Sequence, residues 1–361
     1  MKVYAVGGSV RDNLLGIESK DHDYVVVGSS AEEMLSLGFE QVGQGFPVFL
    51  HPETREEYAL ARREKKVGAG YTGFEFETSP EVSLVQDLSR RDLTINSIAE
   101  DEEGSLIDPF GGVNDLRDKV LRHTSEAFAE DPLRVIRLAR FYARYHSVGF
   151  TVAPETMALA AEMVQRGDLD ELPDERFWLE LEKAFSDKEP EKFFELLFEI
   201  GVMENVRFFK KNFSEASLSV VMRVAKASAI VPKDLRVQVF AAIVYSPIKG
   251  AVLVTARSYN LFGALENVRA LPKFPSALEI HEVLSRARAW STGYTADDLI
   301  LALRVIEAAG TFELYISADR LNKALAVGRA VKSTEFLRYE GPMIGKAMAK
   351  ERVYKIYEVL M

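Results

Sequence analysis

Two aspartates near the start of the chain have the type and spacing that can bind a divalent cation. Asp21 and Asp23 are separated by one residue and lead into the apolar run at residues 24–27, which predicts a strand. Side chains two residues apart in a strand point to the same face, with Cα atoms about 6.5 Å apart. Mg²⁺ typically binds through one or two carboxylates together with substrate phosphates. The pair is therefore a candidate catalytic and Mg²⁺-binding site, although a lone D-x-D is also common where it has no function.

A glycine pair just upstream adds a candidate phosphate site. Gly7 and Gly8 follow the predicted first strand and allow the backbone to turn sharply and approach a ligand. Ser9 is predicted to cap the helix that follows, with Asp12 at the capping-box position. The free N–H groups of that helix, together with Arg11, could bind a phosphate. The order strand, glycine turn, helix and carboxylate strand therefore predicts a metal site beside a phosphate site.

Two further stretches supply candidate side chains. Glu57, on a predicted strand, could join the aspartates as a third catalytic carboxylate or be an exposed charge at the strand end. In the segment RRDLTIN, Arg91 could contact a phosphate, and Asp92 with Asn96 could contact sugar hydroxyls. The alternative for that segment is a surface helix that Asp92 caps and that ends near residue 99.

A later helix carries a stripe of arginines. Asp131 followed by Pro132 predicts a helix start, with Asp as the N-cap and Pro in the first turn. Four arginines of this helix fall within one third of its circumference at 100° per residue: Arg134, Arg137, Arg140 and Arg144. The rest of the helix is apolar, so it is predicted to be buried on most sides. Carboxylates could neutralise the stripe, but a phosphate-bearing ligand explains four arginines more economically.

The elements that must position these residues predict an α+β fold. Residues 1–120 are mixed, with about five strands, and the loop at residues 63–82 is predicted to be long and mobile with one short strand. The rest of the chain shows helical periodicity. Helices are predicted at residues 132–145, 154–165, 174–186, 190–200, 215–227, 233–246, 276–290, 295–309, 311–328 and 342–359.

Composition narrows the class of protein. The 361 residues include no cysteine, which excludes disulfides and thiolate metal sites and fits a reducing compartment. There is no secretory signal pattern and no apolar run near the roughly 18 residues of a membrane span, so a cytoplasmic protein is expected. The net charge of −10 argues against a nucleic-acid partner, yet residues 204–260 carry nine Lys/Arg against three Asp/Glu. That segment predicts phosphate contacts with nucleic acid, or else an ordinary solvated helical surface.

Five ordered motifs resemble those of the class II tRNA nucleotidyltransferases, the CCA-adding enzymes. They are VGGSVRDNLLG with KDHDYVVVG, RRDLTINSIA, IDPFGG, EDPLRVIRLARF and DERFWLELEKA. The detailed resemblance is to the long bacterial type and covers about residues 1–200. It implies a catalytic head with a five-stranded mixed sheet (residues 1–121), a helical neck with the nucleotide-selecting helix (122–203), and a helical body and tail that would bind tRNA (204–361).

The resemblance also implies roles for single residues. Asp21 and Asp23 would hold two Mg²⁺ ions for in-line transfer from CTP or ATP to the 3′-hydroxyl of tRNA. Asp131 and Arg134 would select C or A by hydrogen bonding, without a nucleic-acid template, and the family's last motif would support their helix through Glu175 and Arg176. The implied nucleotide-binding residues are Gly7, Gly8, Arg11, Arg91, Asp92, Asn96, Asp131, Arg134, Arg137 and Arg140.

The resemblance has limits that leave other functions open. Long bacterial relatives carry an HD phosphohydrolase domain, whereas the one His-Asp pair here is His22-Asp23 within the metal motif, so no such activity is expected. A poly(A) polymerase, a partial enzyme adding only CC or A, and an inactive RNA-binding protein stay as alternatives. The loop at residues 63–82 favours the full enzyme, and the intact Asp21 and Asp23 argue against an inactive one. The sequence carries no sign of the oligomeric state.

Overall fold

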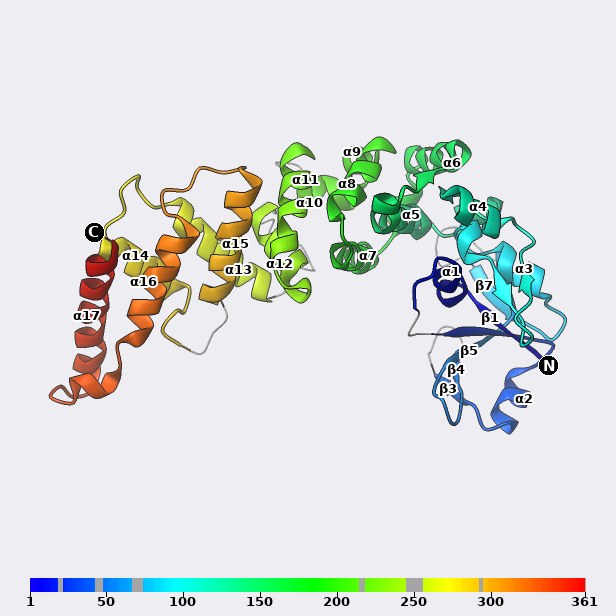
Figure 1. The fold of residues 1–361 in the computed structure, drawn as a ribbon, viewed down its shortest axis with the longest axis horizontal. Helices are drawn as coiled ribbons and strands as arrows, with labels where there is room; N and C mark the ends of the chain where they lie inside the picture. The colour runs from blue at the N-terminus through cyan, green and yellow to red at the C-terminus, as the bar shows by residue number, and fades with distance from the viewer. Residues whose placement is uncertain are drawn as a thin grey trace. The chain divides into compact units, whose positions relative to one another are not determined.

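The computed structural model describes residues 1–18, 22–42, 48–66, 74–213, 218–244, 256–291 and 295–360. The chain divides into two compact units, which are considered separately below. The first comprises Met1–Glu180 and Leu196–Arg207, and the second comprises Leu181–Glu195 and Phe208–Met361. Strands occur only in the first unit among the described residues, so the predicted α+β fold is confirmed (Figure 1).

A seven-stranded mixed sheet forms the centre of the first unit. Its strand order is β3-β4-β5-β2-β1-β8-β9, and β2 and β5 are its one parallel pair among the described residues. The bounds are β1 Lys2–Val6, β2 Asp23–Val27, β3 Glu40–Val42, β4 Val48–Leu50, β5 Glu57–Leu60, β8 Ala99–Glu100 and β9 Leu106–Ile107. The prediction of about five strands missed β3 and β8, which are too short to show an alternating pattern.

Two apolar clusters cover the faces of this sheet. Val25 and Val26 are consecutive in β2 and therefore belong to opposite clusters. Leu88 packs with Val25 and Met34 packs with Val26, and both of these helical side chains are fully buried. The helices that supply them are α2 Ala31–Ser36 and α3 Leu84–Ser89. The sheet is thus fixed on both sides, which holds the ends of β1, β2 and β5 in place.

The turn after β1 differs from the prediction in one respect. Helix α1 spans Gly8–Leu14, and its N-cap is Gly7, with φ of 73°. Ser9 lies inside the helix, where its hydroxyl donates to the carbonyl of Val6 at 3.2 Å. The predicted cap at Ser9 is therefore wrong, because the left-handed backbone at Gly7 lets the helix begin directly after it.

Two other local predictions are also wrong. Strands β6 Arg62–Lys66 and β7 Phe74–Thr78 pair as an antiparallel hairpin, whereas a long loop with one short strand was expected. Residues 67–73 lie outside the described part. The segment after Asp92 forms only the 3₁₀ turn Thr94–Asn96 before entering β8, because its apolar residues are buried on all sides and leave no exposed helical face.

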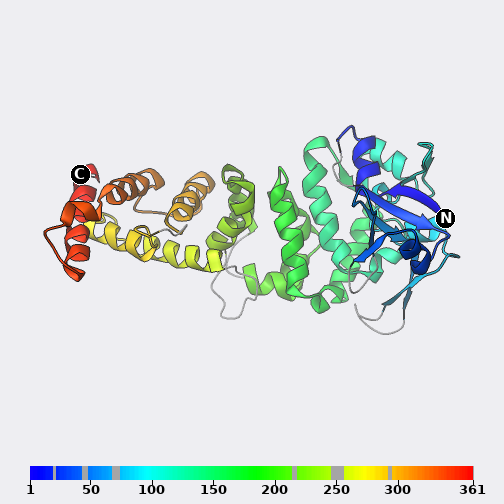
Figure 2. The same cartoon turned by 90° about the horizontal axis from the view of Figure 1, so that it is seen from below.

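Helices make up the remainder of the chain. The first unit holds α4 Gly112–Asp118, α5 Leu133–Tyr145, α6 Pro154–Gln165 and α9 Val202–Asn205, and the division between units falls within α7 Asp174–Ser186 and α8 Pro190–Glu199. Figure 2 shows the helices further along the chain, from green to red. They are α10 Arg207–Phe213, α11 Leu218–Ala227, α12 Arg236–Val244, α13 Ala256–Arg269, α14 Ala277–Arg286, α15 Thr295–Ala309, α16 Ala318–Ala330 and α17 Pro342–Leu360.

The predicted helices correspond to observed ones, with ends that differ by up to seven residues; the largest difference is at α16, which begins at Ala318 instead of residue 311. Five observed helices were not predicted: α3, α4, α9, α10 and α13. In α13 the apolar residues are interrupted by Ser258, Asn260 and Gly263. No helix in the described ranges is long and apolar enough to cross a membrane.

Candidate active site

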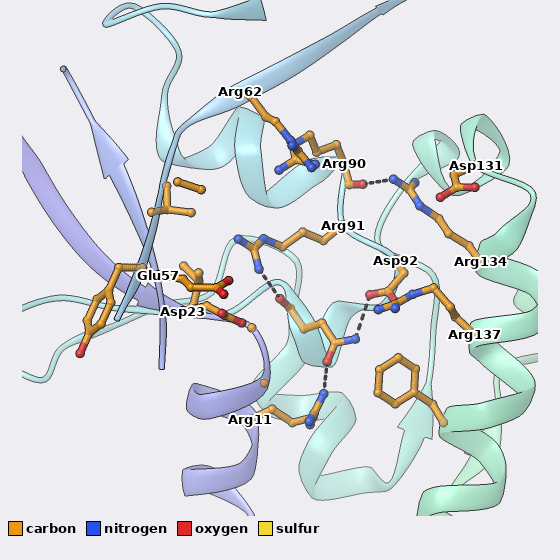
Figure 3. Close-up of a pocket in the computed structure, with 18 of the residues that line it drawn as sticks. Arg11, Asp23, Glu57, Arg62, Arg90, Arg91, Asp92, Asp131, Arg134 and Arg137 are labelled. Atoms are coloured by element: carbon orange, nitrogen blue, oxygen red, sulfur yellow. Dashed lines mark hydrogen bonds and ion pairs between the residues drawn. The ribbon is translucent and has the colours of Figure 1, made fainter. Parts of the chain in front are cut away.

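A pocket of about 530 Å³ in the first unit collects the predicted site residues (Figure 3). Every predicted site residue that the structure describes lines it, and Asp21 lies outside the described residues. Its lining includes two glycines and Asn96, and basic side chains outnumber acidic ones. The arginines are Arg11, Arg62, Arg90, Arg91, Arg134, Arg137, Arg140 and Arg144, and the carboxylates are Asp23, Glu57, Asp92 and Asp131. Such a pocket attracts anions.

Two carboxylates lie side by side at the end of the parallel strand pair. Asp23 of β2 is directly opposite Glu57 of β5, so both side chains point to the same face, on strands about 4.8 Å apart. Both residues are exposed, and within the described part of the chain neither carboxylate has an ion-pair or hydrogen-bond partner. The other two pocket carboxylates, Asp92 and Asp131, are each neutralised by an arginine. Two adjacent uncompensated carboxylates fit a hard divalent cation.

These two carboxylates do not form a complete ligand set by themselves. No group of three or more potential metal ligands occurs among the residues that the structure describes. The prediction of a metal site at Asp21 and Asp23 therefore stays a prediction. The structure places Glu57, the candidate third carboxylate, next to Asp23.

The glycine turn brings backbone against an arginine of the pocket. A Cβ placed on Gly7 would lie 3.1 Å from Nη1 of Arg91, and the residue already has positive φ. Any larger side chain would therefore be strained and would displace Arg91. The turn keeps the start of α1 open to the pocket, beside Arg91.

A chain of hydrogen bonds connects α1 to α5 across the pocket. Arg11 Nη1 donates to Asn96 Oδ1 at 2.5 Å, and Asn96 Nδ2 donates to Asp92 Oδ1 at 2.8 Å. Arg137 Nε donates to the other oxygen of Asp92 at 2.8 Å. Burial alone would raise the pKa of Asp92, but the Arg137 guanidinium and the donated hydrogen bonds outweigh it and hold that pKa well below its usual range. Asp92 is thus ionised at neutral pH, and its carboxylate orients Arg137.

The arginine stripe of α5 faces the pocket and also has protein acceptors. Arg140 Nε donates to the buried Glu180 at 2.5 Å, and Arg144 Nη2 donates to Asp12 at 3.1 Å. Arg134 donates to two backbone carbonyls. The sequence left two kinds of partner open for these arginines, carboxylates of the protein or the phosphates of a ligand. In the structure the arginines have protein partners and still line the pocket, so their guanidinium groups are held in fixed positions.

Asp131 begins this helix, as predicted, to within one residue. Its Oδ1 accepts from the N–H of Leu133 at 3.1 Å, and its Oδ2 pairs with Nη2 of Arg176 at 3.1 Å. Arg176 lies on α7, within the last of the sequence motifs. Arg176 therefore contacts the start of α5 through Asp131, which is the kind of contact that the predicted support requires.

Several pocket residues were missed by the sequence analysis. Arg62 and Arg90 line the pocket but are not in the predicted set, and the fully buried Asp87 pairs with Arg90 at 2.9 Å. Glu180 and Asp12 bind arginines of the stripe. The doubled arginine at residues 90 and 91 was a visible signal, whereas partners far apart in sequence left none.

Two known protein families match parts of the chain. Residues 3–122 match the family described as "Poly A polymerase head domain", and residues 149–209 match "Probable RNA and SrmB- binding site of polymerase A". The motif-based resemblance to nucleotidyltransferases of this type is thereby confirmed for the N-terminal part of the chain.

Curated relatives extend the likeness beyond the poly A polymerase head. The chain is 58% identical over 204 residues to a "Multifunctional CCA protein" of Mannheimia succiniciproducens, which is 56% of this chain and 49% of the relative. It is 59% identical over 204 residues to one of Shewanella denitrificans, with the same two shares. The chain thus spans about half the length of these relatives.

Solved structures resemble the whole fold. "The structure of CCA-adding enzyme apo form II" matches with a TM-score of 0.71 at 21% identity, covering 99% of this chain and 90% of that one. "Structure of tRNA-processing enzyme complex 3" matches with a TM-score of 0.68 at 25% identity, covering 98% and 97%. At this identity the likeness establishes the fold.

Proposed function

We propose that this chain is a CCA-adding nucleotidyltransferase, which adds C, C and A to the 3′ end of tRNA from CTP and ATP without a nucleic-acid template. The observation that carries the proposal is one pocket that joins two uncompensated carboxylates to eight arginines on a poly A polymerase head. Similar chains named "Multifunctional CCA protein" and a solved CCA-adding enzyme complexed with tRNA support it. The proposed regions are a catalytic head (1–121), a neck (122–203) and a tRNA-binding body and tail (204–361).

The metal in this proposal is Mg²⁺, held by Asp21 and Asp23. Nucleotidyltransferases with this head generally use divalent cations, and the uncompensated Asp23 beside Glu57 fits one. When bound, the metal neutralises the triphosphate and lowers the pKa of the attacking hydroxyl. Glu57 supplies a further carboxylate at the same strand end, where it can bind the metal or accept a proton.

The nucleotide is proposed to lie between the glycine turn and α5. Gly7 and Gly8 allow the triphosphate to approach the backbone at the start of α1, with Arg11 and Arg91 beside it. On the other side, Asp92 and Asn96 lie where the ribose hydroxyls would be, and Arg137 and Arg140 complete the cationic wall. Because these side chains already bond one another, the site is largely preorganised.

Base selection is assigned to Asp131 and Arg134. The arginine donates to base acceptors, and the aspartate accepts from the exocyclic amine that C and A share and that G and U do not present in the same pattern. Arg176 holds Asp131, and backbone carbonyls hold Arg134, so both groups are rigid. Rigid hydrogen-bonding groups discriminate between bases because they cannot move to match the donors and acceptors of a wrong base.

The test of the catalytic role is single-turnover transfer from radiolabelled CTP to a tRNA that lacks its 3′ CCA. Asp23→Asn should slow transfer about a thousandfold or more while tRNA binding is kept, because the loss of metal stabilisation amounts to several kcal/mol. Asp118→Asn, at an exposed pair on α4, is the matched control and should transfer normally. An Asp23→Asn variant of full activity would contradict the proposal.

A poly(A) polymerase is the second candidate, since the head family bears that name. A complete Asp131 and Arg134 pair favours an enzyme that accepts both C and A. Arg134→Ala should therefore increase incorporation of G and U relative to C and A, with little change in metal dependence. If base choice is unchanged in this variant, the proposed role of Arg134 in base selection is wrong.

A tRNA-processing enzyme of this kind would act in the cytoplasm.

A further inference from the structure

One buried carboxylate of α1 is shared between its own helix and α5. Asp12 is 8% exposed, and its two oxygens accept hydrogen bonds from three side chains. Oδ1 accepts from Nε of Arg11 at 2.8 Å and from the hydroxyl of Tyr145 at 3.1 Å. Oδ2 accepts from Nη2 of Arg144 at 3.1 Å. Asp12 therefore connects the helix after the glycine turn to the helix that carries the arginine stripe.

The contact between Arg11 and Asp12 is unusual for consecutive residues of a helix. Such side chains normally point about 100° apart and do not face each other. Here both Nε and Nη2 of Arg11 lie 2.8 Å from Oδ1 of Asp12. The guanidinium also lies against the glycine turn, since a Cβ on Gly8 would be 3.6 Å from its Nη2. Asp12 thus holds the charge of Arg11 beside that turn.

Other groups hold the Arg11 guanidinium from further sides. Its Nη1 donates to Oδ1 of Asn96 at 2.5 Å (Figure 3). Its central carbon lies 5.4 Å and 5.5 Å from the ring centroids of Phe141 and Tyr145 on α5. Within the described part of the chain these contacts use at most three of the five N–H groups of a guanidinium. At least two N–H groups therefore remain for a ligand in the pocket that Arg11 lines.

We propose that Asp12 is a positioning residue, which holds Arg11 at the glycine turn so that the guanidinium binds the triphosphate of the incoming nucleotide. This inference rests on the proposed function, in which Arg11 contacts the triphosphate. Asp12 does not line the pocket and acts through Arg11. Through Arg144 and Tyr145 it also ties the triphosphate end of the pocket to α5. An arginine that is already ordered binds a phosphate without the entropic cost of immobilising its side chain.

The charge of Asp12 distinguishes this role from simple charge balance. A carboxylate near a phosphate repels it, so removal of a carboxylate that only balanced charge would strengthen binding of the triphosphate. Arg11 and Arg144 carry two positive charges against the single negative charge of Asp12, so this end of the pocket is cationic even with Asp12 present. Positioning predicts the opposite sign, because the loss of Asp12 releases Arg11.

The first test measures the KM for CTP and kcat in the addition of C to a tRNA that lacks its 3′ CCA. Asp12→Asn keeps the shape of the side chain and removes its charge. It should raise the KM for CTP about tenfold and change kcat by less than about threefold. A merely structural role would give the other pattern, since a smaller folded fraction lowers kcat and leaves KM unchanged.

The chain offers a matched control on α4. Asp118 also accepts a hydrogen bond from the arginine that precedes it, at 3.0 Å, but this pair is exposed and outside the pocket. Asp118→Asn should therefore leave KM and kcat unchanged. Asp12→Glu keeps the charge and moves the carboxylate by one methylene group, so it serves if the loss of charge prevents folding. It should also raise the KM several-fold, and a KM that rises in Asp12→Asn alone would overturn the positioning role.

A second test asks whether Asp12 acts through Arg11. The Kd for inorganic tripolyphosphate with Mg²⁺ is measured by calorimetry, without tRNA. Arg11→Ala and Asp12→Asn should each weaken binding about tenfold, and the double variant should be no weaker than Arg11→Ala alone. Additive losses, an unchanged Kd or tighter binding in Asp12→Asn would overturn the proposal. This binding does not depend on turnover, so a failure of CCA addition would be seen separately, as a lack of product with the unaltered protein.

Discussion

The replacement Asp92→Asn tests the electrostatic centre of the pocket. Asp92 is 7% exposed and accepts hydrogen bonds from Arg137, Asn96 and the N–H of Leu93. Asparagine has the same shape but no charge, so the variant leaves Arg137 without its closest anion. Among the described residues, Arg137 then keeps an ion pair with the more distant Glu180, at 3.8 Å.

The expected loss can be worked from this geometry. Removing one partner of a buried ion pair costs 3–5 kcal/mol, and Arg137 is partly exposed, so we expect about 3 kcal/mol, at the lower end of that range. Tryptophan fluorescence can follow the unfolding of the first unit, since Trp178 is its one tryptophan and Trp290 lies in the second unit. Urea unfolding followed by fluorescence in a Trp290→Phe background should report the free energy of unfolding of the first unit.

The pH dependence of this loss has a definite sign. The pKa of Asp92 is lowered in the folded protein, so its contribution is fully present above the unfolded pKa of about 3.9 and is lost as the pH falls toward the folded value. The difference between the unaltered protein and Asp92→Asn should be constant from pH 7 to pH 5 and should shrink below about pH 4. An equal difference at pH 7 and at pH 3, or no loss at pH 7, would refute the reasoning.

Three other results are expected. Tyr145→Phe removes the hydrogen bond from the phenol to Asp12 (3.1 Å) and should lower the free energy of unfolding by about 1 kcal/mol; no change would mean that this bond contributes nothing. Gly328→Ala should lower the melting temperature of the second unit, followed by Trp290 fluorescence, because its Cβ would lie 2.4 Å from the Trp290 ring, whereas Gly345→Ala meets nothing within 4 Å and should stabilise by about 0.5–1 kcal/mol. Chelation of divalent cations should abolish nucleotidyl transfer, and re-added Mg²⁺ should restore it, with tryptophan fluorescence unchanged. Transfer that persists in chelator would contradict a role for a metal ion.

Local signals in the sequence were sufficient for much of the site. Residues 2–27 show strand, glycine turn and carboxylate strand within a short stretch, and the arginine stripe follows directly from helical periodicity. The N-cap was misplaced because glycine at positive φ can replace a side-chain cap, and no sequence pattern distinguishes the two.

The partners of the arginines could not be predicted in the same way. Asp12 and Arg144 are 132 residues apart, and Arg140 and Glu180 are 40 residues apart. Such pairs depend on how α1, α5 and α7 pack in the folded unit, which periodicity within one element does not describe. Asp87 was missed for the same reason: it binds the main-chain N–H of Arg62, 25 residues away, and the sequence does not show that β6 and α3 lie together.

The most direct test of CCA addition is the length and composition of the product. A tRNA that ends at the nucleotide before CCA is incubated with the protein, Mg²⁺, and CTP or ATP, singly and together. The account predicts that CTP alone adds two nucleotides and that both together add three and then stop. Long A-tails would indicate a poly(A) polymerase, a stop after two C or after one A would indicate a partial enzyme, and no extension would contradict the proposed activity.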